Sequence, residues 1–302
     1  MIEINNVSTL NDILNNCKDG ETIYLKKGTY NGKFHITNNN ITIIGEDVEN
    51  TIITNDDYFH KILNDGNEAN TFRTYTLLVT GSNVTIKNVT IENRSKPSSK
   101  YGQAVALSAC GDNFKCINTI LKSAQDTLFT GPLPKDLIER YTGFLLKEQL
   151  NPRETKQIYE NCKIYGDTDF IFGCSQALFI NSDIISIGKG YLAAPAHAKD
   201  MKYGYLFYKC NLICNGIADG TFLARPWRDY GTAAFIECNV GKHIDLVGFN
   251  KWDNTNRDKT ARFYEYSLNT DLTKREKWVN LLNKDEAIKY VNDFLKYIDY
   301  KL

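Results

Sequence analysis

A short motif recurs along this chain and restricts its fold more than any other feature. Each copy places a small polar residue or a cysteine just before an apolar pair, within a short β-strand pattern. The copies lie at residues 86–91, 117–121, 159–164, 179–184, 207–212 and 235–240. Most are twenty to thirty residues apart, with no long helical pattern between them. Such spacing is typical of a solenoid, in which each repeat contacts only its neighbours.

The fold that fits this pattern best is all-β: a right-handed parallel β-helix. Asn118 and Asn161 occupy equivalent places in two copies. We expect such asparagines to form a ladder in which side-chain amides bond to neighbouring backbone. A β-sandwich is the competing fold, but it needs antiparallel hairpins, and few Asn-Gly or Asp-Gly turns occur between alternating strands.

Helical spacing is expected at both ends of the chain. Residues 8–17 follow a Ser/Thr start and predict a short N-terminal helix. The segment 273–302 predicts a C-terminal helical region, which would cover an open end or a flank of the solenoid. Because no linker or low-complexity tract interrupts the chain, we expect a single domain over residues 1–302.

The interval between Asn118 and Asn161 is longer than the others and predicts an insertion at about 131–155. Its apolar residues have partial helical spacing: Leu137, Ile138, Tyr141, Phe144, Leu145 and Leu146. Two interpretations carry equal weight. The insertion is either a packed surface excursion or, because it follows soon after Asp126, one wall of a substrate groove.

Composition and charge exclude several classes of partner. Lys+Arg and Asp+Glu both number 36, so the net charge is zero and no nucleic-acid surface is expected. The chain has no basic run and no apolar run of about 18 residues, so no membrane association is expected. The N-terminus does not read as a secretory signal, which favours a cytoplasmic location, or a secreted one if the signal is missing from this sequence.

The eight cysteines are expected to be buried thiols rather than disulfides, since a chain of 302 residues can form a stable core without disulfide bonds. None of their spacings forms a Cys-x-x-Cys pair, and the four histidines are scattered. We therefore expect no metal site.

Two carboxylates stand out as candidates for chemistry. Asp126 lies in Gln-Asp-Thr-Leu, and Asp169 lies in Asp-Phe-Ile-Phe-Gly, about forty residues later. A charge among apolar neighbours is costly unless it has a role, and a carboxylate pair suits acid/base or nucleophilic chemistry on an ester or glycoside. Strand alternation would direct Asp169 and Ile171 to one face and Phe170 and Phe172 to the other. A turn or hydrogen-bonding role remains the plainer alternative for each aspartate.

Other candidates surround these carboxylates in the sequence. The side-chain amides of Gln103 and Gln125 are suited to stabilising an oxyanion, although Gln103 could equally satisfy a backbone carbonyl. Arg225 is suited to fix a carboxylate through paired N–H donors, or to form a structural salt bridge. Trp227 and Trp252 offer flat faces for a sugar ring, or simple packing.

Taken together, these motifs resemble the pectin methylesterase (pectinesterase) family, with features of its bacterial members. The resemblance rests on the order of motifs over most of the chain. These are Gly28-Thr29-Tyr30, Gln103 to Leu107, Gln125 to Leu128, Asp169 to Gly173, Leu223 to Trp227, Gly248 to Trp252, and Glu265-Tyr266. The resemblance implies a carboxylic-ester hydrolase that acts on pectin or methylated oligogalacturonides, without metal or organic cofactor.

The resemblance also implies a role for each candidate. Asp169 matches the nucleophile, and Asp126 matches the general acid that protonates methanol and then activates water. Gln103 and Gln125 match the oxyanion donors, and Arg225 matches the group that keeps the nucleophile ionised. Trp227 and Trp252 match aromatic positions that line the groove.

One departure from the family concerns the charge near the nucleophile. Asp167 stands where many members have an uncharged residue, and its charge is expected to raise a neighbouring pKa. The insertion is expected to narrow or deepen the cleft and so to favour short oligomers over the polymer. A monomer is expected.

Three other functions stay open at this point. A lyase or glycosidase of acidic sugars would use the same fold, but no acidic cluster suited to calcium is evident. A non-catalytic β-helix would bind glycans through Trp227 and Trp252. An esterase for a different small ester would keep the same residues and change only the groove.

Overall fold

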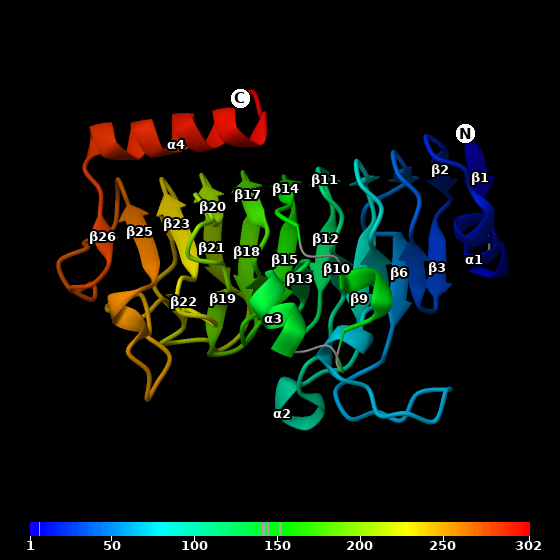
Figure 1. The fold of residues 1–302 in the computed structure, drawn as a ribbon, viewed down its shortest axis with the longest axis horizontal. Coiled ribbons are helices and arrows are strands. Elements are labelled where there is room, and N and C mark those ends of the chain that lie inside the picture. The colour runs from blue at the N-terminus through cyan, green and yellow to red at the C-terminus, as the bar shows by residue number, and fades with distance from the viewer. Residues whose placement is uncertain (6, 141–142, 144, 151–152) are drawn as a thin grey trace.

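A computed structural model describes residues 1–5, 7–140, 143, 145–150 and 153–302. The described chain is a right-handed parallel β-helix made of three sheets (Figure 1). Every strand pair in the three ladders is parallel, and neighbouring strands come from successive coils. The solenoid predicted from the recurring motif is therefore confirmed.

The three sheets are called A, B and C here, and their strands are given in chain order. Sheet A holds β1 (Ile2–Ile4), β2 (Thr22–Leu25), β5 (Thr42–Gly45), β8 (Thr85–Lys87), β11 (Phe114–Ile117), β14 (Lys156–Glu160), β17 (Gln176–Ile180), β20 (Tyr205–Tyr208), β23 (Thr232–Ile236), β25 (Arg262–Tyr266) and β26 (Asn280–Leu281). Sheet B holds β3 (Gly28–Asn31), β6 (Thr51–Asn55), β9 (Thr90–Asn93), β12 (Ile120–Lys122), β15 (Lys163–Gly166), β18 (Asp183–Ser186), β21 (Asn211–Cys214) and β24 (Asn239–Val240). Sheet C holds β4 (Phe34–Ile36), β7 (Leu77–Val79), β10 (Leu107–Ala109), β13 (Leu128–Thr130), β16 (Ile171–Gly173), β19 (Tyr191–Pro195) and β22 (Phe222–Ala224).

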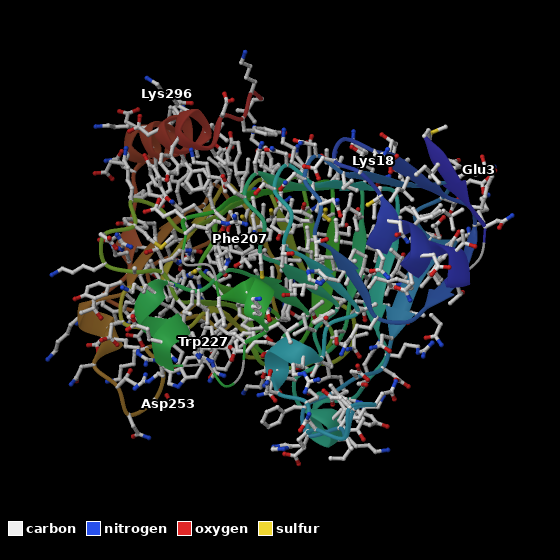
Figure 2. All side chains as sticks on the ribbon, turned by 45° about the vertical axis from the view of Figure 1, so that its right-hand side comes forward. Glu3, Lys18, Phe207, Trp227, Asp253 and Lys296 are labelled. Atoms are coloured by element: carbon white, nitrogen blue, oxygen red, sulfur yellow. The ribbon has the colours of Figure 1, made fainter. Side chains whose placement is uncertain are left out.

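The core runs along the inside of the solenoid, where side chains from successive coils stack. Tyr159, Phe179, Phe207 and Phe235 are in register on sheet A, and their rings lie nearly parallel with centroids 4.5–4.7 Å apart. Figure 2 shows Phe207 among the side chains that fill the solenoid. In the stack, each coil buries its apolar face against the next, as a solenoid requires.

The recurring motif forms the turn between sheets A and B. Asn88, Asn118, Asn161 and Asn181 have φ between +48° and +56°, the left-handed region that asparagine tolerates better than other residues with a Cβ. The expected ladder is found in part, between Asn88 and Asn118, and its bond joins two side chains rather than side chain and backbone. The Asn118 amide donates to Asn88 Oδ1 at 2.8 Å. The cysteines of the motif are buried, and all eight cysteines are free thiols.

Substitution of Asn118 tests this turn. Asn118→Ala is expected to lower the free energy of unfolding by about 1–2 kcal/mol, because alanine is disfavoured in the left-handed region and cannot continue the ladder. Asn118→Gly loses only the ladder bond and should cost less. Urea unfolding of both variants measures the difference. If both variants lose the same free energy of unfolding, the left-handed backbone conformation is not the reason that asparagine is needed at this position.

Helices cover one end and one flank of the solenoid. The helix α1 (Val7–Asn16) closes the N-terminal end, and its Leu10 and Leu14 join the core. The helix α4 (Lys284–Ile298) lies along the outer face of sheet A and buries Val291 and Phe294 there (Figure 1). No helix in the described residues is both long and apolar enough to cross a membrane.

The predicted C-terminal helical region begins later and ends earlier than expected, so the prediction is wrong for residues 273–283 and 299–302. Trp278 instead packs against Phe249 and Phe263 at the C-terminal end of the core, and β26 pairs with β25. The helix starts only after Asn283, whose side chain accepts from the Glu286 N–H in a capping box. Trp278 is apolar because it closes the end of the solenoid, so its hydrophobicity did not indicate a helix. The capping-box residues Asn283 and Glu286 are the better sign of where the helix begins.

The insertion forms the short helix α3 (Lys135–Arg140) and a 3-10 turn, η2 (Lys147–Gln149). Leu137, Ile138 and Leu145 are buried against Phe129 and Phe172 on the outer face of sheet C. The predicted contributions of Tyr141 and Phe144 fall outside the described residues. The described part of the insertion is therefore a packed excursion over this sheet. The remaining short helices are α2 (Ser98–Tyr101), η1 (Thr71–Arg73) and η3 (Arg257–Lys259).

Candidate active site

The candidate residues gather on the outer face of sheet C, on the side of the solenoid away from α4. Figure 2 shows Trp227 on this side and Lys296 of α4 on the other. Asp126 and Asp169 precede β13 and β16, which are adjacent strands in register, and Arg225 directly follows β22. Parallel stacking thus brings together residues that are up to a hundred positions apart in the sequence.

Both aspartates lie in the left-handed backbone region. The φ angle is +62° at Asp126 and +50° at Asp169, and the Asp126 N–H donates to Thr168 O of the next coil at 3.1 Å. Such outliers are costly and often occur at functional sites.

The turn at Asp169 also contradicts the predicted strand alternation. Phe170 and Ile171 are both buried in the solenoid core, and Phe172 packs outside. The positive φ at Asp169 breaks the period of two, so alternation did not apply across this residue.

Arg225 forms a bidentate ion pair with Asp169. Its Nε donates to Oδ1 at 2.9 Å and its Nη2 to Oδ2 at 2.7 Å. The guanidinium lies between two aromatic rings, 3.8 Å from the centroid of Tyr191 and 3.9 Å from that of Trp252. Planar stacking and paired donors fix both the guanidinium and the carboxylate.

The two carboxyl groups differ in electrostatic environment. Burial, the charge of Asp169 and that of Asp167 raise the pKa of Asp126 well above its usual range. Burial also raises the pKa of Asp169, but the hydrogen bonds and charge of Arg225 oppose this rise. In the described residues no cation pairs with Asp126. The first proton to bind the pair therefore resides mainly on Asp126, while Asp169 stays ionised.

Gln103 and Gln125 lie beside the carboxylates on two successive coils. They form a parallel β-bridge, and the Ala104 N–H donates to Gln125 O at 3.1 Å. The Gln103 carbonyl accepts the Phe59 N–H at 2.9 Å. The backbone of these residues is thus fixed, and both side chains line the cleft described next.

All seven residues predicted from the sequence line one cleft of about 380 Å³. Trp252 also makes a contact that the sequence did not suggest, because its ring stacks on the Arg225 guanidinium. Five further residues complete the lining: Phe59, Thr71, Phe72, Phe172 and Ala194. Among the described residues, no group of three or more His, Cys, Asp or Glu side chains is placed to hold a metal ion.

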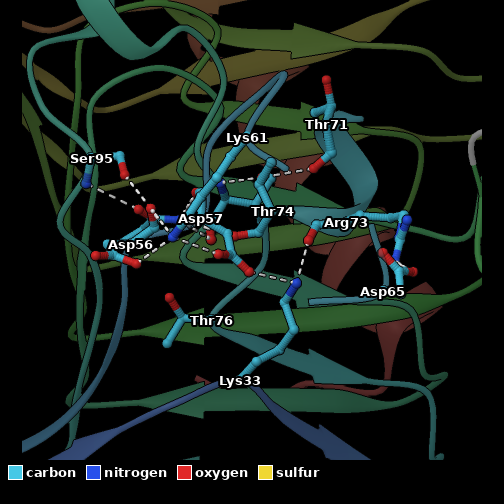
Figure 3. Close-up of polar contacts among 12 residues, drawn as sticks. Lys33, Asp56, Asp57, Lys61, Asp65, Thr71, Arg73, Thr74, Thr76 and Ser95 are labelled. Carbon is cyan, nitrogen blue, oxygen red and sulfur yellow. Dashed lines mark hydrogen bonds and ion pairs between the residues drawn. The ribbon is translucent and has the colours of Figure 1, made fainter. Parts of the chain in front are cut away.

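Three of these additional residues come from the connection between β6 and β7, residues 56–76. An ion-pair network fixes its base (Figure 3). The Asp57 carboxylate lies between two lysines, 2.8 Å from Lys33 Nζ and 3.0 Å from Lys61 Nζ. In the sequence, the only indication that residues 56–76 form a wall of the cleft is the length of this connection.

The insertion does not line this cleft. None of its described residues is among the lining residues, and its Pro134 and Asp136 border two separate hollows instead. The interpretation of the insertion as a wall of the catalytic groove is therefore not supported by the described part. Its contact with the site is indirect, through Phe129 and Phe172.

Comparison with known proteins assigns the chain to a family. The family model described as Pectinesterase matches residues 4–133 and 143–298. The chain belongs to the pectinesterase family. It is therefore an enzyme that hydrolyses carboxylic esters.

Relatives of the pectinesterase family match most of this chain. Pectinesterase 31 of Arabidopsis thaliana is 28% identical over 290 residues, which cover 92% of this chain and 83% of the relative. Probable pectinesterase/pectinesterase inhibitor 12 of the same plant is 26% identical over 308 residues, 94% of this chain. The chain spans only 51% of that second protein, about half its length.

Solved pectin methylesterases share the fold. The enzyme from carrot superposes with a TM-score of 0.78 at 20% identity and covers 100% of this chain and 96% of its own. The enzyme from Yersinia enterocolitica gives a TM-score of 0.77 at 22% identity, over 98% and 99% of the two chains. A pectin methylesterase in complex with a hexasaccharide gives 0.72 at 23% identity, over 94% and 90%.

Proposed function

We propose that this chain removes methyl esters from methylated galacturonate units, with Asp169 as nucleophile and Asp126 as general acid and base. The observation that carries the proposal is the unequal pair of carboxyl groups in one cleft. Asp169 is held by two hydrogen bonds from Arg225, and Asp126 is buried beside it without a cation partner among the described residues. Such a pair supplies one ionised and one protonated group at the same pH.

The chemistry follows in two steps. An Asp169 oxygen attacks the ester carbonyl carbon, and the amides of Gln103 and Gln125 stabilise the oxyanion. The C–O bond to methoxide breaks as Asp126 donates its proton, which gives methanol and an acyl-enzyme anhydride. Asp126 then takes a proton from water, and the resulting hydroxide attacks the same carbonyl. The bond between the carbonyl carbon and Asp169 then breaks, Asp169 regains its carboxylate, and Asp126 is again protonated. The galacturonic acid unit leaves and becomes galacturonate by releasing its proton to solvent.

Replacement of the general acid tests this assignment. Asp126→Asn is expected to reduce kcat for methanol release by about 10²- to 10⁴-fold, the usual contribution of a positioned acid or base. Asparagine accepts the positive φ of this position, so the backbone should not change. Steady-state assays of both proteins measure the loss. Less than a threefold effect would remove Asp126 from the mechanism.

The substrate is proposed to be a short methylated oligogalacturonide as well as pectin. The cleft of about 380 Å³ holds few sugar units, and its aromatic walls are Phe59, Phe72, Trp227 and Trp252. The sequence has no net charge to attract a long polyanion from a distance. We expect kcat/KM per ester to be at least as high for methylated trimers as for long pectin. A tenfold preference for the polymer would contradict this expectation.

The chain is further proposed to act as a monomer with one domain. All seven candidate residues come from one chain, and sheet A continues from β1 to β26. Light scattering of the purified protein tests the proposal, and a dimer or larger species would contradict it.

A further inference from the structure

A third carboxylate lies next to the proposed catalytic pair and has no function in the mechanism above. Asp167 is two residues before Asp169, and the residue is only 9% exposed. Its Oδ2 accepts a hydrogen bond from Ser98 Oγ at 2.7 Å, while Oδ1 is buried without a partner. No ion pair reaches Asp167 from the described residues. A buried carboxylate that is so poorly compensated is costly to keep for structure alone.

The backbone around Asp167 leaves little freedom to relieve this cost. The Asp167 N–H donates to Ala124 O at 2.9 Å, and the Tyr191 N–H donates to Asp167 O at 3.0 Å. A Cβ on Gly190 would lie 2.1 Å from that same carbonyl oxygen. The coils on both sides therefore fix the backbone of Asp167.

The contact with Ser98 links two parts of the site. Ser98 begins α2, and its carbonyl accepts the Gly102 N–H at 2.7 Å, directly before Gln103. Asp167 belongs to the coil that carries Asp169. The Ser98–Asp167 hydrogen bond thus joins the segment of a proposed oxyanion donor to the segment of the proposed nucleophile.

The charged neighbours show where the charge of Asp167 acts. It raises the pKa of both Asp126 and Asp169. Arg225 is engaged by Asp169. Two lysines close to this part of the chain in sequence have other contacts: Lys100 Nζ lies over the ring of Tyr101, and Lys189 Nζ lies near Gly220.

We propose that Asp167 is a positioning residue of this site, which orients Gln103 toward Asp169 through Ser98 and places a third negative charge beside the two carboxylates. The inference rests on the proposed function of Asp169 and Asp126. A site with an uncharged residue at position 167 would lack this third negative charge. The charge and the hydrogen bond make separate predictions.

Asp167→Asn removes the charge and keeps an acceptor for Ser98. We expect both limbs of the pH profile of kcat/KM to move to lower pH. The acid limb follows ionisation of Asp169 and the alkaline limb follows loss of the Asp126 proton, and the pKa of each falls without the third charge. Should Asp167→Asn fail to fold, Asp167→Ser is expected to give the same shift. Asp183→Asn, on sheet B outside the cleft, is the matched control and should leave the profile unchanged.

Ser98→Ala keeps the charge and removes the hydrogen bond. We expect kcat to fall about three- to tenfold with the limbs in place, because misplacement of a catalytic group lowers the rate of the chemical step. If Asp167→Asn or Asp167→Ser folds and the pH profile of kcat/KM does not move, the proposed role of the Asp167 charge is wrong. If kcat of Ser98→Ala equals that of the wild type, the proposed role of the Ser98–Asp167 hydrogen bond is wrong. If wild type itself released no methanol, the proposed function would fail instead.

Discussion

Asp169→Asn should abolish methanol release, with a fall in kcat of about 10⁴-fold or more. The amide has no nucleophilic oxygen anion, and no other carboxylate of the cleft is held by Arg225. The variant should fold, because asparagine tolerates the φ of +50° at this position. Steady-state assays together with circular dichroism measure the two properties.

The control for this variant is Asp183→Asn, which should keep full activity. Asp183 carries the same side chain in β18 and accepts from the Asn211 amide at 2.8 Å, away from the cleft. Retention of more than a hundredth of the wild-type rate by Asp169→Asn would show that Asp169 is not the nucleophile.

Arg225→Met should reduce both activity and stability. The charge and hydrogen bonds of Arg225 lower the pKa of Asp169, whereas burial raises it. Without Arg225 the pKa of Asp169 should therefore rise further, and the acid limb of the pH–rate profile should move to higher pH. Loss of one partner from a buried ion pair costs roughly 3 kcal/mol of folding free energy at neutral pH. At pH values where Asp169 gains a proton, the destabilisation should shrink, because the unpaired charge is then removed.

A second arginine provides the comparison. Arg94 lies 4.0 Å from Asp56, and both side chains are largely exposed. Arg94→Met should therefore change the free energy of unfolding by less than about 1 kcal/mol and leave the pH profile unchanged. Similar effects of the two substitutions in urea unfolding and in the assay would contradict the special position of Arg225.

The sequence predicted the parts of the site that carry a local signal. The Asn88 and Asn118 turns identified the solenoid, and the short motifs around Asp126 and Asp169 identified the cleft residues. Arg225 could be paired with a carboxylate on chemical grounds, although its partner, 56 residues away, needed the parallel stacking of coils.

Other features depend on contacts that leave no local pattern. Phe59 and Phe72 reach the cleft from a connection whose sequence resembles any surface loop. The left-handed conformation of Asp169 changes which face Phe170 occupies, and no periodicity argument anticipates it. The spacing of Trp278 predicts a helix, whereas the residue closes the C-terminal end of the core. The Ser98–Asp167 bond is visible only in three dimensions.

The most direct test of the central claim is methanol release by the wild-type protein from fully methylated oligogalacturonides, measured beside an acetylated oligosaccharide and a simple aryl acetate. The account predicts one methanol for each new galacturonate carboxylate and rates at least a hundredfold lower on the two acetate esters. Hydrolysis of an acetate ester without any methanol from the methylated substrate would contradict it, and would assign the same carboxylate pair to a different ester.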